Sequence, residues 1–272
     1  MKRTPPAANT GRTPWALAMF AAGLGLLTAC VLWAPARWLG SAIGALSAER
    51  VQLADPRGTL WQGSAALVLT GGEGSRDRLA LPGRLHWQWR WPASSGWTAM
   101  GLQVQADCCM PAPTVLHLQG WPGQAEAAID KHDSQWPASL LAGLGAPWNT
   151  LQPEGQLRLH SDGLRLQRTA ERWQLQGTAE LDLHDMSSRL STLRPMGSYR
   201  LRVQGGTAPA LAQIELNTLS GSLKLSGQGQ WVDRRLRFQG EASATSEHEA
   251  ALSNLLNIIG RRQGSRSLLS LG

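Results

Sequence analysis

Residues 84–91 read RLHWQWRW, and apolar and polar side chains alternate in this stretch without a break. A period of two places successive side chains on opposite faces of a β-strand. The apolar set consists of Leu85, Trp87, Trp89 and Trp91. The stretch therefore predicts a strand that gathers indole rings on one side of a sheet, and we take Trp87, Trp89 and Trp91 as candidate residues of an interaction or groove face.

The same alternation recurs through most of the chain. It is found at residues 102–107, 115–120, 156–167, 173–186, 199–205, 214–231 and 236–242. Ser161–Gly163 has the composition of a hairpin turn, and Asp55–Gly58 has that of a type I turn. We therefore expect a mainly β protein with a twisted antiparallel sheet, arranged as a part-barrel, a sandwich or an open groove.

Three segments break the alternation and predict short helices. Two of them are residues 36–48 and 137–144. The third has Ser246 as its expected N-cap and Gly260 as its end, and its apolar face consists of Leu252, Leu255, Leu256 and Ile259. Helices this short cover only part of a large apolar sheet face, so the rest folds on itself or leaves a groove.

An uncharged apolar segment, residues 15–33, precedes the β region. As a helix it would span about 28 Å, close to the thickness of one hydrocarbon core. Trp15 and Trp33 lie at its two ends, and Lys2, Arg3 and Arg12 precede it, which predicts a cytoplasmic N-terminus. We expect a cytoplasmic tail (1–14), a transmembrane helix (15–33) and a periplasmic β-rich domain (34–272). The anchoring side chains are Trp15, Leu24, Leu26, Leu27, Val31 and Trp33.

Two other interpretations of this segment stay open. The sequence LTAC at 27–30 fits a lipobox, which would make Cys30 a lipidated residue. The sequence APA at 34–36 offers small residues for cleavage of a signal peptide. The apolar run continues past Cys30 and is long for a signal peptide, so an uncleaved anchor is the favoured interpretation.

The segment DPRGTLWQGSAALVL, residues 55–69, places a large indole beside a glycine. On a strand that begins at Thr59, Trp61, Gly63 and Ala65 share one face, so Gly63 leaves room for a neighbouring side chain, such as that of Trp61, or for a bulge. Packing is the first interpretation. Presentation of Trp61 to a ligand is the functional alternative, and Trp61 joins the candidate interaction residues.

Residues able to carry out chemistry are dispersed along the chain. The six histidines form no H-x-H or H-E-x-x-H motif, and the sequence has neither a G-x-S-x-G motif nor a P-loop. We therefore expect no catalytic residue, no metal site, no cofactor and no enzyme activity. The net charge is +7, but the sequence contains no basic run with interleaved aromatic residues, so we expect no nucleic-acid partner.

Cys108 and Cys109 are neighbours in the sequence. They do not have zinc-ligand spacing, and no second pair exists. Three options remain for them: a strained small ring closed by a disulfide between them, pairing with other chains, or free thiols.

Five segments in this order resemble the type II secretion system protein N family. They are GTLWQGSAAL (58–67), LPGRLHWQW (81–89), LLAGLGAPWNTLQPEG (140–155), LRPMGSYRLRVQGG (193–206) and LLNIIGRRQGSRSLLSLG (255–272). The resemblance implies a bacterial inner-membrane accessory component of the apparatus that moves folded proteins across the outer membrane. It implies partners among the other components of that apparatus and no catalytic residues.

We accordingly expect a single-pass protein whose periplasmic sheet binds other components without covalent chemistry, with exposed strand edges available for β-augmentation. The alternative is a lipid-binding or lipid-transfer protein. A long sheet with one apolar face, tethered to a membrane, resembles the AsmA-like groove proteins, and the Trp-rich region 87–97 would line such a groove.

Overall fold

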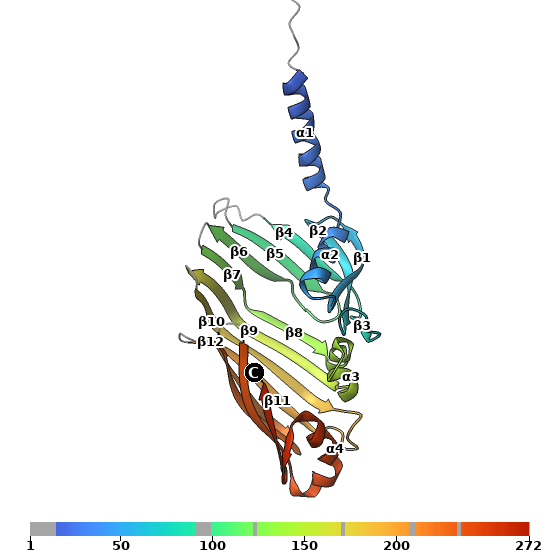
Figure 1. The fold of residues 1–272 in the computed structure, drawn as a ribbon, viewed down its shortest axis with the longest axis vertical. Coiled ribbons are helices and arrows are strands. Elements are labelled where there is room, and N and C mark those ends of the chain that lie inside the picture. Colours follow the sequence, from blue (N-terminus) through green and yellow to red (C-terminus); the bar gives the residue numbers. More distant parts are fainter. Residues whose placement is uncertain are drawn as a thin grey trace, which may run out of the picture.

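The computed structural model describes residues 15–90, 99–121, 124–169, 172–206, 210–232 and 235–271. The expected tail, residues 1–14, and the candidate residue Trp91 lie outside the described residues. The described chain begins with a long helix, continues through a short one, and then forms a large sheet with further short helices (Figure 1).

One antiparallel sheet of 16 strands forms the body of the molecule, which confirms the mainly β prediction. Its strands are β1 (Val51–Gly58), β2 (Gln62–Thr70), β3 (Arg78–Ala80), β4 (Leu85–Arg90), β5 (Ala99–Ala106), β6 (Thr114–Trp121), β7 (Gln124–Ile129), β8 (His132–Pro137), β9 (Glu154–Thr169), β10 (Arg172–Ser187), β11 (Gly197–Gly205), β12 (Ala210–Gly221), β13 (Leu223–Val232), β14 (Arg235–Ala244), β15 (Arg261–Gln263) and β16 (Arg266–Leu271).

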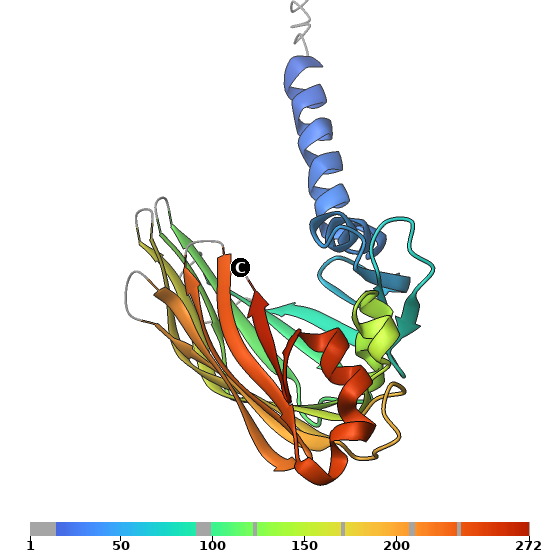
Figure 2. The same cartoon turned by 60° about the horizontal axis from the view of Figure 1, so that its bottom comes forward.

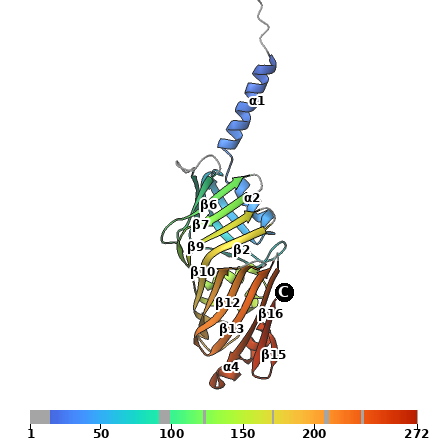
Figure 3. The same cartoon turned by 90° about the vertical axis from the view of Figure 1, so that its left-hand side faces the viewer.

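The order of strands in the sheet almost follows the chain. It runs β1-β2-β4-β5-β6-β7-β9-β10-β11-β12-β13-β14-β16-β15, with β3 beside β2 and β8 beside β9. Figure 3 shows this order running down the long axis of the molecule. In the part of the chain that the structure describes, the path ends at β1 and β15, which do not pair with each other, so the sheet is open rather than closed into a barrel.

Six of the hairpins turn at the same edge of the sheet, which we call the hairpin edge, and the hairpins between them turn at the opposite edge. The hairpin edge is defined by the cross-strand pairs Gly58/Gly63, Arg90/Gly101, Trp121/Gln124, Thr169/Arg172, Gly205/Ala212 and Val232/Arg235. Figure 2 shows the ends of the green to orange strands at the upper left of the curved sheet and the C-terminal helix at the lower right.

Short helices pack on the apolar face. They are α2 (Arg37–Leu46), η1 (Ala138–Leu144), α3 (Trp148–Leu151), η2 (Ser246–His248) and α4 (Glu249–Ile259). Helix α2 begins beside the hairpin edge, where Ala36 N donates to Gly58 O, and the other helices lie away from this edge. Leu252, Leu255 and Leu256 of α4 are buried against strands β9 to β14, as the predicted apolar face requires. Two smaller clusters form under η1 and under α2.

Ser161–Gly163 does not form the predicted hairpin turn, because β9 runs through it as one strand of 16 residues. The segment is a bulge: β9 has one more residue than β10 between the pairs Ser161–Ala179 and Leu164–Gly177. Ser161 Oγ donates to Thr178 O at 3.3 Å and accepts from Gly163 N at 3.2 Å. The extra residue keeps apolar side chains on the same face before and after it.

The predicted type I turn at Asp55–Gly58 is also wrong, because these residues belong to β1. The register between β1 and β2 shifts between Ala54 and Arg57, so the segment is another bulge, and Asp55 has a φ of 47°. The chain reverses after Gly58, where Thr59 N donates to Gln62 O at 2.8 Å.

Ser246 is not the N-cap of the last α-helix. Residues 246–248 form the single turn η2, α4 begins at Glu249, and no side chain caps either element by a hydrogen bond. The end at Ile259, just before Gly260, matches the prediction.

Helix α1 (Trp15–Leu32) is long and apolar enough to cross a membrane. None of its residues is buried against the rest of the described chain. It projects from one end of the sheet (Figure 1), so its apolar side chains need a different environment from water.

Candidate interaction site at the junction of the apolar helix and the sheet

The turn between β1 and β2 is fastened to the end of α1 by hydrogen bonds. Trp61 Nε1 donates to Val31 O at 2.8 Å, and Leu60 N donates to Ala34 O at 2.8 Å. A third bond, from Ala36 N to Gly58 O at 3.1 Å, continues the attachment on the other side of the turn. The indole of Trp61 therefore ties the first hairpin to the helix that precedes it.

Trp87 is the ring that Gly63 accommodates, so Trp61 is not the neighbour that the sequence suggested. Trp61 lies in the turn, because β2 begins only at Gln62. A Cβ on Gly63 would lie 2.6 Å from Trp87 Cζ2. Trp87 is 4% exposed, and its Nε1 donates to Leu60 O at 3.1 Å. This ring fills the junction core and is not available to a ligand.

The remaining candidate tryptophan on β4 has a different environment. Trp89 is half-buried beside the cluster under α2, and its Nε1 is buried with no hydrogen-bond partner among the described residues. Its backbone N donates to Trp61 O at 2.8 Å, so the end of β4 lies next to the β1–β2 turn. The structure thus joins Trp61, Trp87 and Trp89 in one region.

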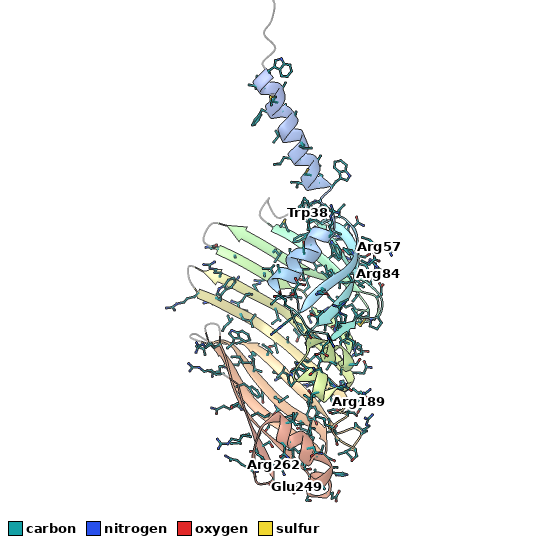
Figure 4. The ribbon with its side chains drawn as sticks, turned by 45° about the vertical axis from the view of Figure 1, so that its right-hand side comes forward. Trp38, Arg57, Arg84, Arg189, Glu249 and Arg262 are labelled. Carbon is teal, nitrogen blue, oxygen red and sulfur yellow. A yellow bond between two sulfur atoms is a disulfide. The ribbon has the colours of Figure 1, made fainter. Side chains whose placement is uncertain are left out.

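Two further indoles lie near the end of α1. Trp33 is 73% exposed and Trp38, at the start of α2, is 53% exposed. Figure 4 shows Trp38 directly below α1. Exposed indole rings beside an apolar helix suit a membrane–water interface, because the ring is apolar and its N–H remains hydrated. Trp38 was not among the predicted site residues, since the helix that carries it has no marked pattern.

Ion pairs lie on the polar face of the sheet. The sequence did not reveal them, because the residues that form them are dispersed along the chain. The Arg200 guanidinium binds both Asp182 oxygens, at 2.6 and 2.7 Å, and these hydrogen bonds lower the pKa of Asp182. Asp55 accepts from Arg57 at 2.8 Å and from Arg84 at 3.0 Å, and the two arginines lie together in Figure 4. Asp182 and Arg200 are direct cross-strand partners in β10 and β11, which explains their contact.

Three histidines on this face each contact an aspartate. The pairs are His86–Asp107 at 3.1 Å, His117–Asp130 at 3.0 Å and His160–Asp133 at 2.9 Å. The hydrogen bond between His160 and the Asp133 carboxylate, which acts as the acceptor, raises the pKa of His160, since the carboxylate favours the protonated ring. All three rings are about half-exposed, and no group of three or more metal-ligating side chains occurs within the described ranges.

The described surface contains hollows on the polar face and beside the two neighbouring cysteines. One, of about 880 Å³, lies over β11 to β14 and is lined chiefly by polar side chains, among them Arg202, Gln204, Gln213, Gln228, Gln230, Arg237 and Gln239. The other, of about 310 Å³, is lined by Asp133, Arg158 and the Cys108–Cys109 pair, whose sulfur atoms are bonded to each other. Cys108 is exposed and Cys109 is buried.

Strand edges offer little room for an added strand. β15, at one end of the described sheet, has three residues, and α2 packs across β1 at the other, with Gly40 close to Leu53. Instead of the strand edges, the polar face of the sheet provides the broad exposed surface. The described chain is thus an open-sheet protein with one apolar helix and surfaces suited to binding.

Comparison with known protein families shows which family this open-sheet protein belongs to. The family model described as type II secretion system (T2SS), protein N, matches residues 49–268, so the chain belongs to this family. The resemblance seen in the sequence is therefore confirmed. No curated protein and no solved structure matches the chain significantly.

Proposed function

We propose that the protein is an inner-membrane accessory component of the type II secretion system. The observation that carries the proposal is the family match over residues 49–268, which follows directly after the apolar helix α1. In this arrangement α1 crosses the inner membrane as an uncleaved anchor, and residues 34–272 lie in the periplasm. Lys2, Arg3 and Arg12 support a cytoplasmic N-terminus, because basic residues remain on that side.

The sheet would act by non-covalent contact with other components of the secretion apparatus. The polar hollow over β11 to β14 is the part of the described surface best suited to a protein partner, because it presents many hydrogen-bonding groups on rigid strands. β-Augmentation is disfavoured, since the described sheet ends in a three-residue strand and in a strand packed against α2. The proposal includes no catalytic step and no cofactor.

Membrane topology is tested with alkaline phosphatase fused after Gly272, because this reporter folds only in the periplasm. We expect phosphatase activity in cells that express the full chain. A fusion that is inactive, together with an active cytoplasmic reporter at the same position, would reverse the proposed orientation.

Secretion is tested by deleting the gene and measuring how secreted enzymes divide between periplasm and medium. We expect secreted enzymes to accumulate in the periplasm, and the full chain to restore export. A chain whose residues 1–33 are replaced by a cleaved signal should restore export poorly, because it lacks the anchor. Normal secretion combined with altered outer-membrane permeability in the deletion strain would contradict the proposal.

A further inference from the structure

Half of the apolar face of the sheet has no helix over it. Eight side chains next to the hairpin edge form what we call the open strip: Leu116, Leu118, Ile129, Leu164, Leu166, Leu175, Val203 and Ile214. Each is only half-buried, and none belongs to the three core clusters, which lie under the helices. The short helices thus close the apolar face at one end and leave it uncovered at the other.

The open strip is continuous across several strands because its members are direct cross-strand partners. Leu116 pairs with Ile129, which pairs with Leu164. Farther along the sheet, Val203 pairs with Ile214. The bulge at residues 161–163 is what keeps Leu164 and Leu166 on the apolar face, since without the extra residue they would point to the polar side.

The hairpin edge, where the open strip ends, begins at the apolar helix. The β1–β2 turn is hydrogen-bonded to the end of α1 through Trp61 and Leu60, and the end of β4 is bonded to the same turn. From there the strand order runs down the long axis of the sheet, so the hairpin edge continues away from α1 (Figure 3). If α1 lies in a membrane, the β1–β4 end of this edge lies next to that membrane, and the open strip follows the edge away from it.

Side chains typical of a lipid interface line this edge. Trp173 is 48% exposed and Trp231 is 39% exposed, and the guanidinium of Arg168 lies 5.7 Å from the centre of the Trp173 ring. The exposed arginines at this edge are Arg90, Arg168, Arg172 and Arg235. Arginine attracts anionic headgroups, and an indole suits the boundary between headgroup and acyl chain.

We propose that the open strip binds an acyl chain of a phospholipid from the membrane that holds α1, with the headgroup at the hairpin edge. From Trp173 to Leu181, the first residue of β10 that packs against the main core, the strand rises by about 26 Å at ~3.3 Å per residue. One leaflet of a ~30 Å hydrocarbon core is about 15 Å deep, so an acyl chain fits this length. This proposal does not depend on the role in secretion.

Site-specific photocrosslinking tests it with matched positions on the two faces of the same strands. p-Benzoylphenylalanine replaces Val203 or Ile214 on the open strip, or Gln204 or Gln213, which form the neighbouring cross-strand pair on the polar face. The full-length variants are placed in vesicles of phosphatidylethanolamine and phosphatidylglycerol (7:3) and irradiated. Mass spectrometry should find phospholipid adducts at least about tenfold more abundant at the two strip positions. Equal adducts on both faces, no lipid adduct, or adducts only to protein would overturn the proposal.

Fluorescence provides a second measurement that needs no bulky substitution in the strip. Phospholipids brominated on their acyl chains, in vesicles of the same composition, quench only indoles that contact those chains. We expect the quenched part of the emission to fall in Trp173→Phe and to stay unchanged in Trp148→Phe, because Trp148 is exposed on α3 at the helix-covered side. An equal effect of the two substitutions would contradict lipid binding at the hairpin edge. Both measurements are independent of secretion, so either proposal can fail alone.

Discussion

A methyl group added at Gly63 should destabilise the junction between α1 and the sheet. The new Cβ would lie 2.4 Å from Arg57 O and 2.6 Å from Trp87 Cζ2. The first neighbour is a backbone atom of the paired strand, and the second belongs to a buried ring held by hydrogen bonds to Leu60 and Thr59. Because neither can move freely, Gly63→Ala should lower the free energy of unfolding by about 1–3 kcal/mol.

The measurement is urea unfolding of the full chain in detergent, followed by the far-ultraviolet circular dichroism of the sheet. Gly120→Ala in β6 is the matched control, since a Cβ there would meet no atom within 4 Å. An alanine in that open strand position should stabilise slightly, by about 0.5 kcal/mol. With a difference of about 2.5 kcal/mol and a slope of ~3 kcal/mol/M, the two midpoints should differ by about 0.8 M. Coincident midpoints would refute the assignment of Gly63 as space for Trp87.

Three further substitutions test other parts of the structure. Trp61→Phe keeps the ring but removes the hydrogen bond to Val31 O, so proteolysis at residues 33–37 should become faster while the stability of the sheet, measured by urea, stays within about 1 kcal/mol. Leu256→Ala truncates a fully buried side chain on the inner face of α4 and should lower the unfolding free energy by about 2–5 kcal/mol, measured in the same assay. Asp182→Asn should cost about 1 kcal/mol at pH 7, because the carboxylate binds Arg200 through two hydrogen bonds. Since the pKa of Asp182 is lowered from 3.8 by folding, the wild type loses this stabilisation only as the pH falls below about 4, and the variant should show less acid dependence there.

Alternation predicted the strands well because one face of this sheet packs and the other meets water. The stretches around β4, β10, β11 and β14 all show it, and each lies within one or two residues of its predicted place. Strands β7 and β8 lack the pattern: QAEAAI is nearly uniform in small residues, and HDSQWP is mostly polar. These two strands exist because β9 provides a long edge on which both can pair.

The two turn predictions failed for a common physical reason. Glycine and aspartate adopt a positive φ more readily than most residues, but a bulge in a strand uses that conformation as readily as a hairpin does. Gly163 has a φ of 112° within β9, and Asp55 has one of 47° within β1. Which outcome occurs depends on the strands on either side, and local composition contains no information about them.

The junction could be predicted only in part. The sequence indicated that Gly63 makes room for a neighbouring side chain or a bulge, and the structure shows that the side chain is that of Trp87 on a neighbouring strand. The contact of Trp61 with Val31 joins residues thirty positions apart and follows from how the first hairpin folds back on α1. Such a contact is a property of the assembled fold.

The order of strands also affects how the protein can fold while it is being synthesised. Nearly every strand pairs with one that has already emerged, so the sheet can lengthen from α1 outward one hairpin at a time, with mostly local contacts. Until synthesis ends, the most recently formed strand is an exposed edge strand, and any other extended chain can pair with it. The three-residue strand β15 then covers half of β16 and leaves too short a ladder for continued growth. The last elements to appear thus serve as a stop that protects the finished molecule from edge-to-edge aggregation.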